Sequence, residues 1–229
     1  MEIRLGSLAR DAREAEGTVI IIDVFRAFTT AAIAFDHGAS HLVLVAEVEE
    51  ALALHNRGVG DLLMGEEGGK RPDGFDFGNS PYEISQVDLS GKSLVQSTRA
   101  GTVGVAAATR AESIYLGSFA VAEATVNAIL VENPPLVSII AMGDQGRARS
   151  DEDEHCALYL RNLLEGRKPD IGALRRLIME GGATQKFFDE NQPQYHPQDV
   201  ELALQVNRYP FAMRITREDG LLVARKQDP

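Results

Sequence analysis

The 229-residue sequence is poor in cysteine, in long apolar runs and in positive charge, and each shortage excludes some classes of protein. Cys156 is the only cysteine, so an internal disulfide is excluded and a reducing, cytoplasmic location is expected. No stretch reaches the roughly 18 consecutive apolar residues of a membrane-spanning helix, and the charged N-terminus lacks the apolar core of a secretory signal. Basic residues number 23 against 34 acidic ones, giving a net charge of −11. We therefore expect neither nucleic acid nor a membrane as partner, because both are bound through clustered Lys and Arg.

Apolar, β-branched runs alternate with amphipathic stretches along most of the chain. Short strands that are apolar throughout and separated by helices indicate a parallel sheet covered on both faces. The sequence therefore predicts one α/β domain over residues 1–229, with a three-layer α/β/α architecture and a mostly parallel sheet. The expected strands are residues 18–24, 41–46, 61–65, 93–97, 113–116 and 136–142. The expected helices are residues 26–36, 47–57, 101–111, 119–132 and 151–165.

The last third of the chain, from about residue 167, departs from this alternation. Helical stretches near 170–190 and 197–208 precede two apolar segments, FAMRIT and LLVAR, which flank the turn sequence REDG. This pattern predicts a C-terminal β-hairpin that turns around residues 218–220. Because no linker separates it, we interpret this third as a helical and hairpin extension of the same domain.

Asp23 directly follows an apolar run and is the first candidate for chemistry. In parallel α/β sheets, ligands bind beyond the carboxyl ends of the strands. Arg26, Thr29 and Thr30 open the following helix, whose first N–H groups favour anions. The structural alternative is that Asp23 caps this helix and pairs with Arg26.

The loop GEEGGKRPDGFDFGNSP, residues 65–81, is rich in glycine and in acids. Glu66, Glu67, Asp73 and Asp76 offer the oxygen ligands that a hard cation such as Mg²⁺ prefers. An ordinary charged surface loop has the same composition, so that interpretation stays open.

The segment SLVQSTRAGT at residues 93–102 joins an expected strand to an Ala-rich helix. Ser97, Thr98 and Thr102 offer hydroxyl groups and Gly101 an uncovered N–H, which suits an anion. A plain helix N-cap is the alternative. The Gly-Lys-Ser/Thr ending of a Walker A loop is missing, so a nucleotide is not implied.

Glu152 and Asp153 stand in a fourth segment, shortly after the expected strand 136–142. Asp153 also completes a capping-box pattern with Ser150, which gives it a purely structural alternative. The five histidines show no zinc-binding spacing.

As an ordered set, the four segments resemble the 2-phosphosulfolactate phosphatase (ComB-like) family. The resemblance rests on DVFRAFTT at 23–30, on the glycine-rich loop ending in GFDFGNSP at 65–81, and on SDED at 150–153. It implies a Mg²⁺-dependent phosphoric monoester hydrolase that acts on a small phosphorylated hydroxy acid, as in coenzyme M biosynthesis.

The resemblance also implies roles for particular residues. The expected catalytic residues are Asp23, Arg26, Glu66 and Asp76. The expected metal ligands are Asp23, Glu66, Asp76, Glu152 and Asp153. The expected substrate- and phosphate-binding residues are Thr29, Thr30, Asn79, Ser80, Ser97, Thr98, Arg99, Gly101 and Thr102.

One segment departs from the family pattern. Where we expect Thr-Thr-Asn-Gly-Thr, this chain has STRAGT at residues 97–102, with Arg99 in place of an amide and one extra residue. Arg99 suits an anionic substrate, and the choice among phosphorylated hydroxy acids stays open. Two other functions also stay open: another Mg²⁺-dependent phosphoryl-transfer enzyme or isomerase, and a non-catalytic phosphometabolite-binding protein. The expected partner is a small anionic phosphorylated substrate, and the sequence is compatible with a homodimer.

Overall fold

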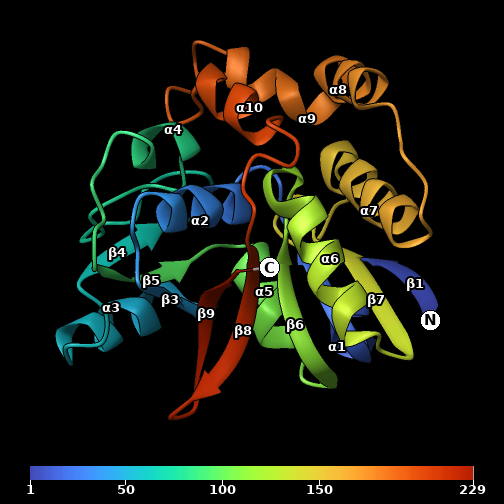
Figure 1. The fold of residues 1–229 in the computed structure, drawn as a ribbon. Coiled ribbons are helices and arrows are strands. Elements are labelled where there is room, and N and C mark those ends of the chain that lie inside the picture. The colour runs from blue at the N-terminus through green and yellow to red at the C-terminus, as the bar shows by residue number, and fades with distance from the viewer. Residues whose placement is uncertain (229) are drawn as a thin grey trace.

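Nine strands form one sheet with helices on both faces in the computed structural model, which describes residues 1–228 (Figure 1). The strand order is β1-β7-β2-β6-β8-β9-β3-β5-β4. Every antiparallel pairing involves β8 or β9, so the predicted mostly parallel α/β fold is confirmed. The strands are β1 (Glu2–Ser7), β2 (Gly17–Ile22), β3 (His41–Val45), β4 (Leu62–Gly65), β5 (Ser93–Ser97), β6 (Ala111–Gly117), β7 (Leu136–Ala141), β8 (Ala212–Glu218) and β9 (Leu221–Gln227).

The C-terminal hairpin lies in the middle of the sheet. Its tip, at Asp219 and Gly220, has the positive φ angles, 49° and 83°, that a tight hairpin turn requires. β8 pairs with β6 and β9 pairs with β3, which joins the parallel group β1-β7-β2-β6 to the parallel group β3-β5-β4. The predicted hairpin is confirmed, but it is an integral part of the sheet rather than an extension of it.

β1 is an edge strand that the sequence pattern did not predict. It runs parallel to β7, from Glu2 opposite Leu136 to Ser7 opposite Ala141, and helix α1 (Leu8–Glu14) follows it. Half of its residues are exposed, so charged residues are tolerated and the apolar periodicity that marks an inner strand is missing.

β2 is buried on both faces and separates two apolar cores. Val19 and Ile21 pack in the core that contains α2 and α5, whereas Ile20 and Ile22 pack in the core that contains α6 and α7. A third core, beneath α3, covers the other face of β3, β5 and β4. The helices of these layers are α2 (Ala27–Asp36), α3 (Val48–Asn56), α4 (Pro81–Ile84), α5 (Gly101–Ala107), α6 (Ala122–Glu132) and α7 (Asp151–Leu164).

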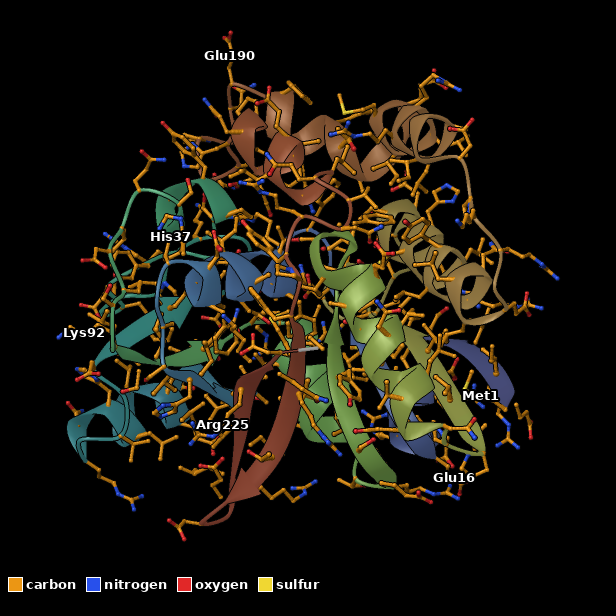
Figure 2. The ribbon with its side chains drawn as sticks, in the orientation of Figure 1. Met1, Glu16, His37, Lys92, Glu190 and Arg225 are labelled. Carbon is orange, nitrogen blue, oxygen red and sulfur yellow. The ribbon has the colours of Figure 1, made fainter. Side chains whose placement is uncertain are left out.

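The chain between residues 171 and 203 forms a layer that we call the C-terminal cap, drawn across the top of Figure 1 above α2 and α7. Phe187, on its inner side, is 1% exposed, and burying a side chain of this kind contributes about 1.5–3 kcal/mol. Glu190 projects from its outer side, as Figure 2 shows. The cap contains α8 (Ile171–Glu180), α9 (Gly182–Gln185), a 3₁₀ turn (Lys186–Phe188) and α10 (Pro197–Ala203). Within residues 1–228, no helix combines the length and apolar character needed to cross a membrane.

Candidate active site

A cavity of about 660 Å³ lies between the loops that follow β2, β4 and β7 and the C-terminal cap. Parallel strands end at the same edge of a sheet, which is where α/β proteins bind their ligands. The cavity therefore occupies the place that the strand pattern predicts. Its charged and polar lining residues include Asp23, Arg26, Glu66, Asn79, Asp151, Glu152, Lys186 and Tyr195.

Asp23, at the end of β2, is only 5% exposed, and backbone N–H groups hold both of its carboxylate oxygens. Its Oδ1 accepts a hydrogen bond from Ala27 N at 3.0 Å, so Asp23 does cap α2. Its Oδ2 accepts a hydrogen bond from Gly101 N at 2.8 Å. A Cβ atom at position 101 would lie 2.9 Å from that oxygen, so only glycine leaves the carboxylate undisturbed. Asp23 thus has one fixed orientation at the cavity wall.

Burial raises the pKa of Asp23 to about 6. The N–H groups of Ala27 and Gly101 oppose this rise, while the negative charge of Glu66 adds to it. A carboxyl group with such a pKa changes its protonation state easily when a cation enters the cavity.

Glu66 follows β4, and its carboxylate reaches the same loop that holds Asp23. Its Oε1 accepts a hydrogen bond from Arg99 N and its Oε2 one from Gly69 N, each at 2.7 Å. Since Arg99 N and Gly101 N are two residues apart, the loop after β5 binds Glu66 and Asp23 together. This loop brings the acids of two separate parallel strand groups into one cavity.

Glu152 lies in the first turn of α7, lines the cavity and is 3% exposed. Its Oε2 atom is buried and has no hydrogen-bond partner within residues 1–228. Burial raises the pKa of Glu152 to about 8. A buried carboxylate oxygen without a donor is costly unless a cation or a proton satisfies it.

The sequence suggested Asp153 as a metal ligand, but in the structure its carboxylate accepts hydrogen bonds from two backbone N–H groups. Its Oδ1 accepts a hydrogen bond from Val24 N and its Oδ2 one from Gly143 N, each at 2.8 Å. These bonds connect the ends of β2 and β7 to α7, and Asp153 is not among the cavity-lining residues. Burial and the nearby charges of Glu152 and Asp23 raise its pKa well above the usual range.

Arg26 lines the cavity but pairs with Asp199 of the cap rather than with Asp23. Its Nη1 atom lies 3.0 Å from Asp199 Oδ2 and donates a second hydrogen bond to the Gln194 carbonyl at 2.9 Å. Its Nη2 donates to the Gly69 carbonyl at 3.1 Å. Arg26 therefore fixes the cap and the loop after β4 around the cavity. The positive charge of Arg26 lies at the cavity wall.

Asp76 and the side chain of Arg99 lie outside the cavity. Asp76 is exposed, and its carboxylate accepts a hydrogen bond from Leu63 N at 2.8 Å, which closes its own loop onto β4. The Arg99 guanidinium turns to Glu47, at 3.0 Å, so only the backbone N–H of Arg99 serves the site. Neither side chain can share a metal or a phosphate with Asp23 in this arrangement.

Most of the predicted hydroxyl ligands are engaged in local hydrogen bonds. Thr98 and Thr102 bond each other's backbone N–H groups at the start of α5, which is the helix-cap alternative. Thr29 and Thr30 donate to carbonyls at the start of α2, at 2.9 Å each.

Three further predicted ligands differ from one another. Ser80 donates to Asp199 at 2.6 Å. Ser97 is buried without a partner within residues 1–228 and is not a lining residue. Asn79 lines the cavity with a buried Oδ1 that likewise has no partner within those residues.

Sequence reasoning missed the contribution of the C-terminal cap. Lys186 and Tyr195 line the cavity, and Asp199 is the buried partner of Arg26. No spacing pattern marks any of the three, because a cap residue reaches the site only through the tertiary fold. Asp151, in the first turn of α7, is also a lining residue.

The residues fit a magnesium ion held in the manner usual for Mg²⁺. Within residues 1–228, no group of three or more His, Cys, Asp or Glu side chains forms a ready-made metal cluster. Mg²⁺ usually keeps several waters and uses only one or two carboxylates together with substrate phosphate. Asp23 and Glu66 supply such a pair, and the orphaned oxygen of Glu152 supplies a third acid at the same cavity.

In a comparison with known proteins, residues 7–192 of this chain match a family model described as 2-phosphosulpholactate phosphatase. A probable 2-phosphosulfolactate phosphatase of Bacillus subtilis (strain 168) is 33% identical over 204 residues, which cover 88% of this chain and 87% of that protein. Its counterpart in Caldicellulosiruptor saccharolyticus is 34% identical over 178 residues, covering 76% and 72%. The counterpart in Thermoplasma acidophilum is 31% identical over 178 residues, covering 78% and 79%.

Proposed function

The chain belongs to the 2-phosphosulfolactate phosphatase family and is a phosphoric monoester hydrolase, and we propose that its substrate is a small phosphorylated hydroxy acid that it hydrolyses with Mg²⁺. 2-Phosphosulfolactate itself is the first candidate, because the relatives carry its name. Family membership favours hydrolysis over the alternative of a non-catalytic binding protein.

One observation carries the proposal: the three-residue loop 99–101 holds both Asp23 and Glu66 at one cavity. Phosphoryl transfer depends on positioning and on stabilising charge. Fixed carboxylates from separate strand groups provide a rigid place for a cation, because neither can turn away without losing two backbone hydrogen bonds.

The charge of the cavity supports the metal. Asp23, Glu66, Asp151 and Glu152 face a space that has to accept a phosphate dianion. Without a compensating cation, these acids would repel the substrate. Magnesium held by one or two of these carboxylates, first of all the Asp23 and Glu66 pair, would act as a Lewis acid that neutralises charge on the phosphate oxygens, with Glu152 as a further acid at the same cavity.

The chain's own residues position the reaction and limit the access of water. Hydrolysis breaks the bond between phosphorus and the substrate's hydroxyl oxygen, and water supplies the new oxygen on phosphorus and the proton on the released alcohol. Asp23 and Glu66 keep two carboxylates in a fixed orientation at the strand edge, where a cation that pairs with the phosphate would bind. Arg26 adds a buried positive charge and holds the cap in place, which limits the access of bulk water.

Phosphate release from a panel of phosphorylated acids tests the proposal. We expect release from 2-phosphosulfolactate or a related two- or three-carbon phosphorylated acid, loss of release in EDTA, and recovery when excess Mg²⁺ is added. Release that EDTA does not change would remove the metal from the proposal. Release from p-nitrophenyl phosphate alone would remove the substrate class.

A further inference from the structure

Lys186 lines the cavity from the C-terminal cap, whereas the acids of the cavity come from other segments of the chain. Its charge is opposite to theirs. Lys186 opens the 3₁₀ turn of the cap, while Asp23, Glu66 and Glu152 come from the loops after β2 and β4 and from α7. Its positive charge acts on both Asp23 and Glu152, lowering the pKa that each would otherwise have. Lys186 therefore stands near the acids without belonging to their loops.

Aromatic rings hold the Lys186 ammonium group in position. Its Nζ lies 5.1 Å from the centre of the Tyr195 ring and 5.7 Å from that of Phe187. These rings pack edge to face at 5.3 Å, and Phe25 packs on Phe187 in the same way at 5.1 Å. A cation beside packed aromatic rings is attracted to them and loses part of its hydration, which strengthens its interaction with an anion.

The arginines near the site already have acidic partners. Arg26 pairs with Asp199 and Arg99 with Glu47, each at 3.0 Å. Arg149 lies 3.5 Å from Glu154 and is 70% exposed, so its charge is largely solvated.

Lys186 differs from all of them. Among residues 1–228 no acidic oxygen lies within 4.0 Å of its ammonium group. Within the described residues, its ammonium group is therefore a cavity-lining charge that makes no ion pair, and the anionic group of a ligand can bind to it.

We propose that Lys186 binds the second anionic group of the substrate, a carboxylate or sulfonate, while the phosphate occupies the side of Asp23 and Glu66. This inference rests on the proposed function and adds the residue that selects acids over neutral phosphate esters. A lysine ammonium suits this task because it is a point charge and needs no paired-oxygen geometry, so carboxylate and sulfonate are equally acceptable. The subsite also explains how an acid-rich cavity binds a substrate with two negative ends.

Two phosphate esters that differ only in one group provide the test. 2-Phosphoglycerate carries a carboxylate where glycerol 2-phosphate carries a hydroxymethyl group. A hydrogen bond between charged groups contributes about 1.5–3 kcal/mol, so Lys186→Gln should raise KM for 2-phosphoglycerate roughly 10- to 100-fold. Loss of the Lys186 charge also acts on Asp23 and Glu152, and this effect is common to both esters, so KM for 2-phosphoglycerate should rise at least about tenfold more than KM for glycerol 2-phosphate. Lys186→Arg should restore most of the affinity.

Lys168→Gln is the matched control, because Lys168 is exposed outside the cavity and its loss removes the same charge. A second measurement, independent of turnover, is calorimetric binding of sulfolactate, the acid without its phosphate. Lys186→Gln should weaken this binding about tenfold or more, and Lys168→Gln should not.

The possible results separate the two proposals. Equal KM changes for both esters, or equal sulfolactate affinity in wild type and Lys186→Gln, would overturn the role of Lys186. Wild-type protein that does not bind sulfolactate would overturn it as well. Wild-type protein that binds sulfolactate through Lys186 but hydrolyses no phosphorylated acid would support the subsite and refute the proposed function.

Discussion

Arg26, at the N-cap of α2, and Asp199 of α10 form a buried ion pair with 3.0 Å between Nη1 and Oδ2, and their side chains are 3% and 0% exposed. The second oxygen of Asp199 accepts hydrogen bonds from Ser80 Oγ at 2.6 Å and from Tyr82 N at 2.9 Å. One aspartate therefore ties the C-terminal cap to α2 and to the loop before α4. By pairing with Arg26, Asp199 also fixes the position of the Arg26 positive charge at the cavity.

Replacing Asp199 by Asn should destabilise the protein strongly. The amide keeps the volume but leaves the Arg26 charge buried without a counter-charge, which typically costs about 3–5 kcal/mol. Urea unfolding measures the loss, and Asp219→Asn at the exposed hairpin tip is the control, with an expected change below about 0.5 kcal/mol. A loss below about 1 kcal/mol for Asp199→Asn would show that the pair is not needed to hold the cap.

The metal-free protein should become less stable as pH rises from about 4 to about 8. The pKa values of Asp23, about 6, and Glu152, about 8, lie above the ordinary values of 3.8 and 4.5. Between the ordinary and the raised pKa, the folded state binds more protons than the unfolded state, so stability is lost as pH increases.

Urea unfolding in EDTA at several pH values checks this, with an expected fall of about 5 kcal/mol between pH 5 and pH 8. Glu152→Gln should flatten the upper part of the fall. Exposed Glu201→Gln should leave it as in wild type. A stability that is constant or increases over this interval would contradict the raised pKa values that burial gives these two acids.

Magnesium should stabilise the folded protein, and more so at higher pH. Protons compete with a cation for the carboxyl groups of Asp23 and Glu152, so the metal binds better once they are ionised. The measurement is the increase in Tm on adding MgCl₂ at pH 6 and at pH 8. Glu66→Gln should reduce the increase at both pH values, and an unchanged increase would remove Glu66 from the metal ligands.

The sequence suggested Asp23 because it directly follows an apolar run, and Glu66 because it stands in a glycine-rich acidic loop, and both line the same cavity. Asp23 after β2 and Glu66 after β4 lie where the rule for parallel sheets puts ligands. The same reasoning did not find that the hairpin joins the two parallel strand groups, since periodicity identifies a strand but not its neighbours.

Other features of the site depend on tertiary contacts that leave no local pattern. Lys186 and Asp199 reach the site from a segment whose own sequence shows only amphipathic helices. The hydroxyl groups of Thr98 and Thr102 suited an anion equally well, but they accept hydrogen bonds from Thr102 N, in the first turn of α5, and from Thr98 N, just before it. A motif therefore indicates which groups are available, and only the fold shows which remain free.

Gly101→Ala should lower activity, and overpacking against the buried Phe28 ring should also cost about 1–3 kcal/mol of stability. The added Cβ would lie 2.9 Å from both Asp23 Oδ2 and the Phe28 ring, so the carboxylate has to shift. We expect kcat for phosphate release to fall about 10- to 100-fold, as small displacements of catalytic groups do. Gly172→Ala, on the exposed surface of α8, is the control and should keep full activity. Wild-type kcat in Gly101→Ala would mean that the fixed position of Asp23 is unimportant.

The joint action of Asp23 and Glu66 is the central claim, and phosphate release by Asp23→Asn, Glu66→Gln and the double variant tests it most directly. Each single variant should lose about a thousandfold or more in kcat while keeping the wild-type circular dichroism spectrum. Because residues that act as a unit do not contribute additively, the double variant should be within about tenfold of the weaker single variant. An Asp23→Asn enzyme within about tenfold of wild type, or losses that multiply in the double variant, would contradict the account.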